Sequence, residues 1–315
     1  MNIILPDYKT ITDGDISLDI FKKYGDVKYY ERLEYEQLPE ILKDADVIFC
    51  NKTPLNPETL RYADNLKYIG LFATGYNNVD IEYAKARGIR VCNAGSYSTN
   101  AVAQHTFALI LGFFNKTAQY DSFIKDGGYA RNNFFSSFEY GLEELAGKTI
   151  GIIGAGSIGQ TVARIAEAFD MRVIVYSRTV RFPDRYTYVS FDELLERSDI
   201  ITIHCPLNEA SYKLFDDAAF AKCREGAFLV NTARGPIVDE AALCRALKSG
   251  RLKGAALDVF EVEPLPQDSP LMHVPNIILT PHIAWAAKET RQRLLGIVVD
   301  CFEAYLHGGK KNVIV

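Results

Sequence analysis

The segment 148–179 constrains the fold of this 315-residue chain more than any other stretch. An apolar run leads into Gly-Ala-Gly-Ser-Ile-Gly, an amphipathic helical pattern follows, and a second apolar run ends at Tyr176. A strand, a glycine-rich turn, a helix and a strand in this order form the context that a dinucleotide-binding fingerprint requires. The first glycine permits the tight turn, the second lets the backbone approach a pyrophosphate, and the third lets helix and sheet pack closely. The free N–H groups at the helix start would face the phosphates, and the residues assigned to this site are Gly154, Gly156, Ser157, Ile158 and Gly159.

The positions after the second apolar run indicate which nucleotide binds. An NAD site usually has Asp or Glu about 20 residues past the glycines, where the carboxylate binds the ribose 2′-hydroxyl. Here the positions are Ser177, Arg178 and Thr179, with Arg181 close behind. A hydroxyl and a guanidinium can bind a 2′-phosphate through charge-assisted hydrogen bonds, whereas a carboxylate would repel it. We expect NADP(H) to be favoured over NAD(H); the alternative is that Arg178 is a solvated loop arginine and that the site accepts either cofactor.

Composition and charge narrow the class of protein. An apolar fraction of 48% and a charged fraction of 24% are ordinary for a globular protein with two substantial cores. The net charge of −5 gives no electrostatic reason to expect a nucleic-acid partner. The six cysteines form no CxxC pair and no short Cys/His spacing, so we expect reduced thiols in a cytoplasmic protein and no metal site. The strand-like start leaves no room for a signal peptide, and the longest uncharged run, 91–115, is too polar to span a bilayer.

Short apolar runs alternate with helical patterns on both sides of the fingerprint. The expected strands are 2–5, 27–30, 46–50, 67–71 and 89–92 before it, and 200–203, 227–230, 254–258 and 277–280 after it. The expected helices include 80–87 with Asp80 as N-cap, 99–115, 239–249 and 288–306. This alternation predicts an α/β fold with two doubly wound parallel sheets.

The order of these patterns predicts that one domain is inserted into the other. The last helix carries an apolar face suited to packing back on the first domain. We expect a flavodoxin-like substrate domain formed by 1–98 plus 286–315, and a Rossmann dinucleotide-binding domain at 99–285. Cofactor and small substrate would meet in an interdomain cleft.

Residues 116–147 interrupt the periodicity with glycine and asparagine pairs. They carry six aromatic residues: Tyr120, Phe123, Tyr129, Phe134, Phe135 and Phe138. An aromatic-rich irregular excursion within a compact enzyme suggests a subunit contact, which would make the protein a homodimer. The alternative is that the rings only hold the excursion on its own domain.

Three polar segments follow the later strands: Asn-Thr-Ala-Arg-Gly at 231–235, Asp-Val-Phe-Glu-Val-Glu-Pro at 258–264, and Thr-Pro-His-Ile-Ala-Trp at 280–285. Each lies where an open α/β sheet places its ligands. Together with the fingerprint, and in this order, they resemble the D-isomer-specific 2-hydroxyacid dehydrogenases, and matching segments cover nearly the whole chain. Within that family the segments 51–55, 73–80 and 281–285 are most similar to the glycerate dehydrogenases and hydroxypyruvate reductases.

The resemblance implies roles for three side chains. Arg234 would bind the substrate's carboxylate and carbonyl, because a planar fork fits those oxygens and polarises the carbonyl. His282 would be the general acid in reduction, and Glu263 would hydrogen-bond its imidazole and hold its orientation. The alternatives are that Arg234 is a surface loop residue, that Glu263 is a solvated acid, and that His282 is a satisfied core histidine.

The resemblance also implies the remaining contacts. The backbone N–H groups of Ala73, Thr74 and Gly75 would hold the substrate carboxylate, and Lys52 would add positive charge over a polar tail unless it is a solvated loop lysine. Asp258 would anchor the nicotinamide carboxamide. The other cofactor contacts implied are His204, for which a structural role is the alternative, Pro206, Thr232, Ala233 and Ala284. Gln104, where the family commonly has Glu, receives no role.

These assignments predict an oxidoreductase that uses NAD(P)H to reduce a small 2-oxoacid to a D-2-hydroxyacid. Hydroxypyruvate or glyoxylate, giving D-glycerate or glycolate, is the first expectation, and lactate-type or branched-chain acids are the alternative. A nucleotide-sensing protein like the corepressors that share this fold is the alternative of another class; those proteins carry terminal extensions for partners, which we do not expect in this protein.

Overall fold

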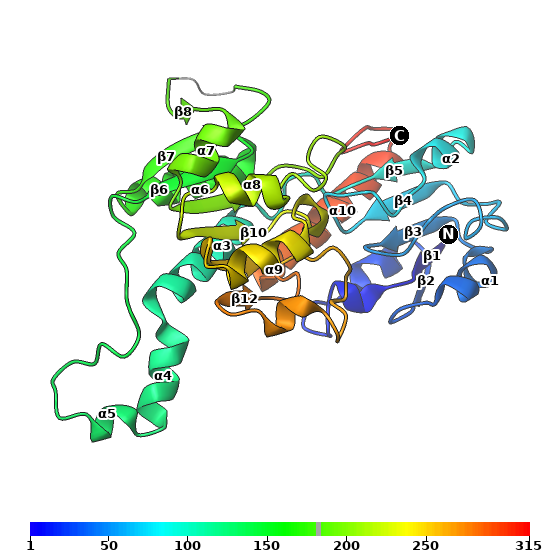
Figure 1. The fold of residues 1–315 in the computed structure, drawn as a ribbon. Helices are drawn as coiled ribbons and strands as arrows, with labels where there is room; N and C mark the ends of the chain where they lie inside the picture. The colour runs from blue at the N-terminus through cyan, green and yellow to red at the C-terminus, as the bar shows by residue number, and fades with distance from the viewer. Residues whose placement is uncertain (181–183) are drawn as a thin grey trace. The chain divides into compact units, whose positions relative to one another are not determined.

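The computed structural model describes residues 1–180 and 184–315, so Arg181 lies outside the described residues. The chain divides into two compact units, Met1–Ser98 with Ala286–Val315, and Thr99–Trp285 (Figure 1). Each unit is built on one parallel sheet, which confirms the expected α/β fold with two doubly wound sheets. None of the helices in the described part of the chain combines the length and apolar character that crossing a bilayer requires.

The first unit has the strand order β2-β1-β3-β4-β5, which is the flavodoxin-like order. Its strands are β1 (Asn2–Leu5), β2 (Asp26–Tyr29), β3 (Val47–Cys50), β4 (Tyr68–Leu71) and β5 (Arg90–Cys92). Its α-helices are α1 (Leu38–Leu42), α2 (Ile81–Ala86) and α10 (Lys288–Leu306), with short 3-10 turns at Tyr8–Thr10, Asp19–Lys23 and Tyr35–Gln37.

Two different cores cover the faces of this first sheet. Helix α2 begins where predicted, because Asp80 accepts a hydrogen bond from the Tyr83 N–H at 2.9 Å, and it packs with α1 on one face. On the other face α10 contributes Phe302, whose ring lies 5.0 Å from that of Tyr68 and 5.3 Å from that of Phe49. The C-terminal helix is therefore part of the first unit's core.

The second unit has the order β12-β11-β10-β9-β6-β7-β8, with all neighbours parallel, as in a Rossmann sheet. Its strands are β6 (Thr149–Ile153), β7 (Arg172–Tyr176), β8 (Thr187–Tyr188), β9 (Ile200–Ile203), β10 (Ala227–Asn231), β11 (Leu252–Leu257) and β12 (Ile277–Leu279). Short 3-10 turns lie at Gly235–Ile237 and Pro270–His273.

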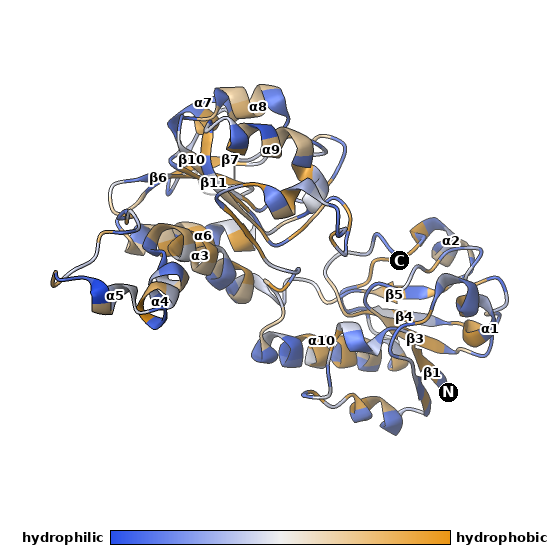
Figure 2. Cartoon of the chain, turned by 60° about the horizontal axis from the view of Figure 1, so that its bottom comes forward, coloured by the Kyte–Doolittle hydropathy of each residue, from blue (hydrophilic) through white to orange (hydrophobic). Residues whose placement is uncertain are grey.

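Helices cover both faces of the second sheet. One face packs against α3 (Thr99–Asn115) and α6 (Ser157–Ala168), which lie side by side (Figure 2). The other packs against α7 (Phe191–Arg197), α8 (Asp217–Lys222) and α9 (Glu240–Lys248). Because both faces are covered, the central strands are buried along their whole length and consist mostly of apolar residues.

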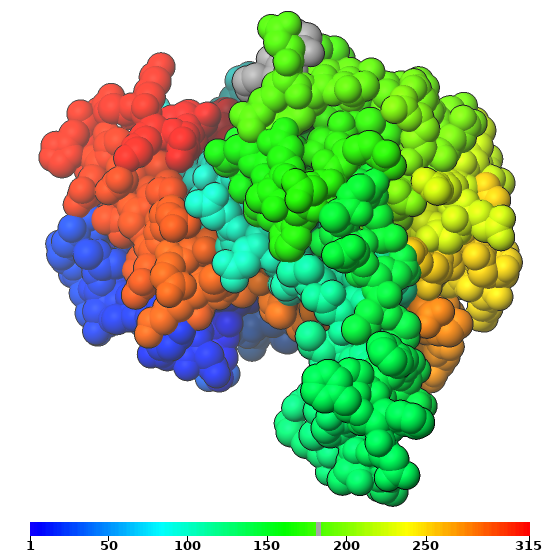
Figure 3. Space-filling model, turned by 90° about the vertical axis from the view of Figure 1, so that its left-hand side faces the viewer, coloured from blue at the N-terminus to red at the C-terminus, as the bar shows by residue number. Residues whose placement is uncertain are grey.

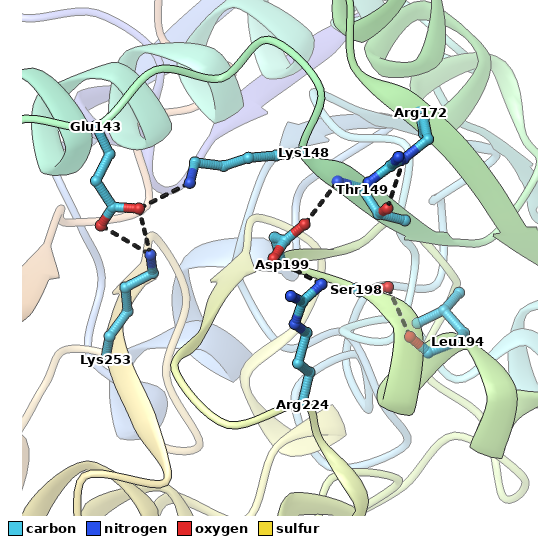
Figure 4. A network of polar contacts seen from close by, with 9 residues as sticks. All are labelled: Glu143, Lys148, Thr149, Arg172, Leu194, Ser198, Asp199, Arg224 and Lys253. Atoms are coloured by element: carbon cyan, nitrogen blue, oxygen red, sulfur yellow. Dashed lines mark hydrogen bonds and ion pairs between the residues drawn. The ribbon is translucent and has the colours of Figure 1, made fainter.

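Charged side chains bind the amino ends of these strands together (Figure 4). The carboxylate of Glu143 lies 2.8 Å from both Lys148 and Lys253. Asp199 accepts a hydrogen bond from the Thr149 N–H at 2.8 Å and lies 3.0 Å from Arg224. The opposite ends of the strands, their carboxyl ends, also carry polar groups, and these form the candidate site described below.

The excursion within the second unit is more regular than predicted. Residues 117–131 form α4 (Thr117–Lys125) and α5 (Gly128–Arg131), where the glycine and asparagine pairs predicted irregular structure. Its aromatic residues fall into two groups, one packed inside the excursion and one exposed. Tyr120 packs edge-to-face on Tyr140 and Phe123 inside the excursion. In contrast, Phe134, Phe135 and Phe138 are 76%, 94% and 88% exposed, and Figure 3 shows the excursion standing off from the rest of its unit.

Candidate active site

The candidate site lies at the carboxyl edge of the second sheet. Strands β10, β11 and β12 are adjacent and parallel, so the loops that follow them emerge at the same edge. These loops carry Arg234, Glu263 and His282 respectively. A set of polar residues from three adjacent loops is what an open α/β sheet offers a ligand.

The side chains of Glu263 and His282 are hydrogen-bonded to each other. Nδ1 of His282 lies 2.7 Å from Oε2 of Glu263. The second carboxylate oxygen of Glu263 accepts the Phe260 N–H at 3.1 Å, which fixes the carboxylate in its own loop. Both side chains remain partly accessible, at 26% for His282 and 31% for Glu263. The pair is therefore oriented by the protein and still open to a ligand.

Asp258 organises the loop that carries His282. Its carboxylate accepts hydrogen bonds from the backbone N–H groups of Ile283 and Ala284, at 2.9 and 2.8 Å, and from the Thr280 hydroxyl at 2.6 Å. Its own carbonyl oxygen accepts the His282 N–H at 2.8 Å. Burial raises the pKa of Asp258, but the hydrogen bonds from His105, Thr280 and the two N–H groups outweigh it and lower that pKa overall. Asp258 is thus a fully buried residue that contacts the backbone N–H groups of His282, Ile283 and Ala284.

The turn that carries Arg234 is held by Asn231, a residue to which no role was assigned on sequence grounds. The buried Asn231 side chain accepts the Ala233 N–H at 3.0 Å and donates to the Arg234 carbonyl oxygen at 2.9 Å. The residue after Arg234, Gly235, passes so close to the neighbouring loop that a Cβ there would lie 1.9 Å from the Phe260 carbonyl group. The turn after β10 and the loop after β11 are therefore packed backbone to backbone.

The glycine-rich turn follows β6 at the point where the strand order reverses between β6 and β9. A Cβ on Gly154 would lie 2.8 Å from backbone atoms of His204 and Cys205, and the φ of Gly154 is +103°. A Cβ on Gly159 would lie 2.0 Å from the Gly154 carbonyl oxygen, whereas the space beside Gly156 is open. The N-cap of α6 is Gly156, which has no side chain to cap the helix. This combination of open space and uncapped helical N–H groups fits a bound pyrophosphate.

His204 lies beside this turn, at the end of β9. Both of its ring nitrogens are inaccessible to solvent and have no hydrogen-bond partner among the described residues, although the residue as a whole is only half-buried. Burial lowers its pKa to about 3, so the ring is neutral at physiological pH. A ligand seated at the switch between β6 and β9 would find polar atoms here with no partner in the described part of the protein.

The remaining cofactor positions lie at the same edge. Ser177 is half-buried after β7, and Arg178 and Thr179 are exposed. The Thr232 hydroxyl lies 3.2 Å from that of Thr106 on α3, and the Pro206 carbonyl oxygen accepts a hydrogen bond from Ser211 at 2.8 Å. Within residues 1–180 and 184–315, no three His, Cys, Asp or Glu side chains are grouped as metal ligands.

The substrate positions expected from the sequence belong to the first unit. The segment 73–75 is fixed by the Thr74 carbonyl oxygen, which accepts from Asn93 at 2.6 Å. Lys52 is exposed on a loop whose N–H groups converge on Asp7: the Lys52 and Thr53 N–H groups lie 2.7 and 2.8 Å from Oδ2 of Asp7. Asp7 is only 3% exposed, so a buried carboxylate determines the course of this loop.

Comparison with known proteins identifies the family. Residues 107–284 match the family model described as D-isomer specific 2-hydroxyacid dehydrogenase, NAD binding domain. The chain is also 36% identical to a hydroxypyruvate reductase of Blautia hydrogenotrophica over 321 residues, which cover 100% of this chain and 99% of that protein. The chain belongs to the D-isomer-specific 2-hydroxyacid dehydrogenase family. A glycerate dehydrogenase of Methylorubrum extorquens is 38% identical over 282 residues, which are 89% of this chain and 88% of that relative.

Solved structures agree with this D-2-hydroxyacid dehydrogenase assignment. A D-lactate dehydrogenase of Aquifex aeolicus, complexed with NAD and lactic acid, has a TM-score of 0.84 at 30% identity and covers 98% of this chain and 96% of its own. An acyclic imino acid reductase, Bsp5, in complex with NADPH and D-arginine, has a TM-score of 0.88 at 32% identity and covers both chains completely. As a member of this family, the dehydrogenase binds a nicotinamide dinucleotide and reduces 2-oxoacids.

Four residues that hydrogen-bond around the candidate positions were assigned no role on sequence grounds: Asp7 in the first unit, and His105, Asn231 and Thr280 in the second. Asp7, Asn231 and Thr280 lie at or just beyond the carboxyl ends of strands. That position in the sequence is the feature that could have identified them as candidate site residues. His105 lies inside helix α3, and nothing in the sequence around it indicates that its side chain lies close to Thr280.

Proposed function

We propose that this dehydrogenase reduces hydroxypyruvate or glyoxylate to D-glycerate or glycolate with NAD(P)H. The single observation that carries the proposal is the hydrogen bond between His282 and Glu263, at the same sheet edge as the turn that bears Arg234. The relatives named hydroxypyruvate reductase and glycerate dehydrogenase support the choice of substrate. Lactate-type and branched-chain acids are the alternative substrates, because these three residues would act on the shared carboxylate and carbonyl and not on the substrate's tail.

The hydrogen bond assigns separate tasks to the two ring nitrogens of His282. Glu263 occupies Nδ1, which leaves Nε2 for the substrate. His282 would donate the Nε2 proton to the carbonyl oxygen as hydride reaches the carbonyl carbon, so that the carbonyl group becomes a hydroxyl group. The bound nicotinamide supplies the hydride. The Arg234 guanidinium would bind the carboxylate and carbonyl oxygens and polarise the C=O bond.

The first unit would supply the other substrate contacts. The backbone N–H groups of Ala73, Thr74 and Gly75 would bind the substrate carboxylate, since successive N–H groups form anion-binding concavities. Lys52 would extend the positive charge toward a polar tail. Its loop is already ordered by Asp7, so little further ordering would accompany binding.

A matrix of NADPH and NADH against small oxoacids, followed through nucleotide oxidation, tests this proposal. We expect turnover, with hydroxypyruvate or glyoxylate giving the highest kcat/KM. Arg234→Gln and His282→Gln should each lower kcat/KM by roughly a hundredfold or more, equivalent to about 3 kcal/mol. His307→Gln, at an exposed position in the first unit, is the matched control and should keep full activity. No turnover with either nucleotide on any oxoacid would refute the proposal and favour the corepressor-like alternative.

We also propose that NADP(H) is preferred over NAD(H). Arg178 is exposed beside Ser177 at the end of β7, where a guanidinium would bind a 2′-phosphate. Arg178→Asp should raise the KM for NADPH about tenfold or more and leave the KM for NADH similar or lower. Arg197→Asp, on α7, is the control for an added negative charge elsewhere in the same unit. An unchanged ratio of the two KM values in Arg178→Asp would mean that Arg178 does not select the cofactor.

A homodimer through the excursion is the proposed assembly. The apolar side chains of Phe134, Phe135 and Phe138 are among the most exposed in the described part of the chain, and contiguous exposed apolar surface marks interaction sites. Replacing all three with Ser should reduce the mass measured by light scattering from that of two chains to that of one. Tyr62→Ser removes a half-exposed ring from the first unit and should leave the mass unchanged. A wild-type protein with the mass of one chain would contradict the proposal.

A further inference from the structure

We propose that His105 on α3 is a positioning residue that holds the loop bearing His282 in place through Thr280 and Asp258. Nε2 of His105 lies 3.0 Å from the Thr280 hydroxyl oxygen and 3.3 Å from Oδ1 of Asp258. The inference rests on the proposed function, because it assigns His105 a purpose in the reaction for which His282 would donate the proton.

The hydrogen-bond pattern settles which atom carries each proton. The Thr280 hydroxyl has one proton, and at 2.6 Å from Oδ1 of Asp258 it donates that proton to the carboxylate. Toward His105 the same oxygen can only accept. Nε2 of His105 must therefore carry a proton, which it shares between Thr280 and Asp258.

This proton matters because Asp258 is a buried carboxylate. The Asp258 side chain is 0% exposed, and among the described residues its ion-pair partner is His105, which is itself 18% exposed. A buried carboxylate that loses a donor loses electrostatic stabilisation that solvent cannot replace. Removing the His105 donor should therefore weaken the position of Asp258 and of every group that hydrogen-bonds to it.

Those groups form the main chain around His282. The Ile283 and Ala284 N–H groups donate to the Asp258 carboxylate, and the His282 N–H donates to the Asp258 carbonyl oxygen. His282 itself has a φ of +54°, a left-handed conformation that a non-glycine residue keeps only when its surroundings enforce it. The hydrogen bonds that Asp258 accepts from His282, Ile283, Ala284 and the Thr280 hydroxyl enforce it. His105 is joined to these bonds through Oδ1 of Asp258.

Helix α3 also contacts the loop on the other side of the site. The residue next to His105, Thr106, donates its hydroxyl proton to the Val102 carbonyl oxygen at 2.8 Å and so accepts from Thr232 at 3.2 Å. Thr232 precedes the turn that carries Arg234. Two consecutive residues of one buried helix thus contact the two loops that carry the proposed substrate-binding arginine and the proposed general acid.

Enzyme kinetics with matched variants test the role of His105. His105→Leu removes the donor, His105→Gln places an amide N–H2 near the position of Nε2, and Thr280→Val removes the bridging hydroxyl at constant shape. We expect His105→Leu and Thr280→Val each to lower kcat on the order of tenfold, with the KM for oxoacid changed less than about twofold, and His105→Gln to recover most of the loss. The kcat of the double variant His105→Leu/Thr280→Val should be no lower than that of the slower single variant, because the two side chains act as one unit.

The control is Ser198→Ala, which removes a buried hydroxyl that donates to the Leu194 carbonyl oxygen away from the site, and it should keep wild-type kcat. Three results would overturn the inference. The first is that the losses of kcat in the two single variants add in the double variant. The others are that His105→Gln is as slow as His105→Leu, or that the variants change only the KM for oxoacid. If His105→Leu does not fold, as judged by circular dichroism, His105→Gln and Thr280→Val decide the question alone.

A measurement that does not depend on turnover separates this inference from the proposed function. The chain has five histidines, so nitrogen-15 labelling of histidine gives an assignable spectrum. At neutral pH we expect a protonated Nε2 on His105 that exchanges slowly with solvent, and faster exchange in Thr280→Val. If the wild-type protein shows this spectrum but has no activity, the proposed reaction is refuted and the role of His105 stands. If the enzyme is active but Nε2 of His105 carries no proton, the role of His105 is refuted and the proposed reaction stands.

Discussion

The imidazole of His282 and the carboxylate of Glu263 lie 2.7 Å apart although they belong to different loops, after β12 and β11. The contact requires that both loops keep their course, since each residue is also fixed within its own surroundings: Glu263 by the Phe260 N–H, and His282 by the Asp258 carbonyl oxygen. The orientation of the proposed general acid is therefore a property of two neighbouring loops together.

The first prediction concerns Glu263→Gln. The amide keeps the shape of the side chain but removes its negative charge, and it can turn an N–H2 group toward Nδ1. We expect kcat for oxoacid reduction to fall about ten- to a hundredfold, with a smaller change in KM, because the imidazole loses its fixed orientation in the transition state. Steady-state kinetics measure both constants. Glu196→Gln, at an exposed position on α7, is the control, and equal kinetics for the two variants would show that Glu263 does not orient His282.

The second prediction concerns Gly235→Ala. A Cβ at this position would lie 1.9 Å from the carbonyl carbon and oxygen of Phe260, and backbone atoms cannot turn away as a flexible side chain can. The loops after β10 and β11 would have to separate, so we expect a loss of about 1–3 kcal/mol in the free energy of unfolding and a loss of activity. Denaturant unfolding measures the first quantity and nucleotide oxidation the second.

The matched control for Gly235→Ala is Gly296→Ala. Gly296 lies inside α10, and a Cβ added there would have no atom of the described residues within 4 Å beyond its own stretch of helix, so the added methyl group meets open space. Because Ala favours helix over Gly by about 1 kcal/mol, this variant should be as stable as the wild type or more so. A Gly235→Ala protein that behaves like the control would mean that the two loops separate without cost.

Local sequence patterns predicted the scaffold well because they reflect local physics. Helix α3 spans Thr99–Asn115 as expected, since an apolar pattern that contains no proline leaves few alternatives. Asp80 caps α2, and Gly154 and Gly159 lie where a side chain would collide with backbone. The segment 117–131 was predicted poorly, because its helices form in spite of glycine and asparagine pairs at their ends.

The contacts that organise the candidate site could not be predicted in the same way. His105 and Thr280 are 175 positions apart, and no periodicity or spacing joins them. The same holds for Asp7 and Lys52, whose contact depends on β1 and β3 being neighbours in the sheet. Motifs indicate which residues a site contains, whereas the hydrogen bonds that fix their positions follow only once the strand order is known.

A third prediction concerns a buried hydroxyl outside the site. The hydroxyl of Thr202 on β9 is fully buried and has no hydrogen-bond partner among the described residues. Val has nearly the same shape without the polar atom, and an unpaired buried hydroxyl costs about 1–3 kcal/mol. Thr202→Val should therefore raise the free energy of unfolding, measured in urea, by about 1 kcal/mol. Thr106→Val removes a hydroxyl that is hydrogen-bonded, so it should lower the free energy of unfolding. Equal effects of the two variants on that free energy would contradict the explanation.

The last prediction concerns pH and His204. Burial lowers the pKa of His204 to about 3 in the folded protein, against 6.5 for an ordinary histidine. Between these values the unfolded chain binds a proton that the folded protein does not, so stability rises with pH across this range and falls as the pH decreases from 6.5. The contribution is at most about 1.4 kcal/mol per pH unit. Urea unfolding of the cofactor-free protein at several pH values from about 7.5 down to about 5 should show this slope.

Replacing the ring tests the origin of that slope. His204→Gln lacks a titratable group, so its free energy of unfolding should depend less steeply on pH than that of the wild type. His307→Gln removes a histidine whose ring is exposed and hydrogen-bonded to the Glu303 carbonyl oxygen at 2.7 Å, and it should keep the wild-type slope. Saturating nicotinamide nucleotide should raise the free energy of unfolding without changing the contribution of His204 to the slope between about pH 5 and 7.5, because the folded protein already holds this ring neutral across that range. A His204→Gln slope equal to that of the wild type would place the titrating group elsewhere.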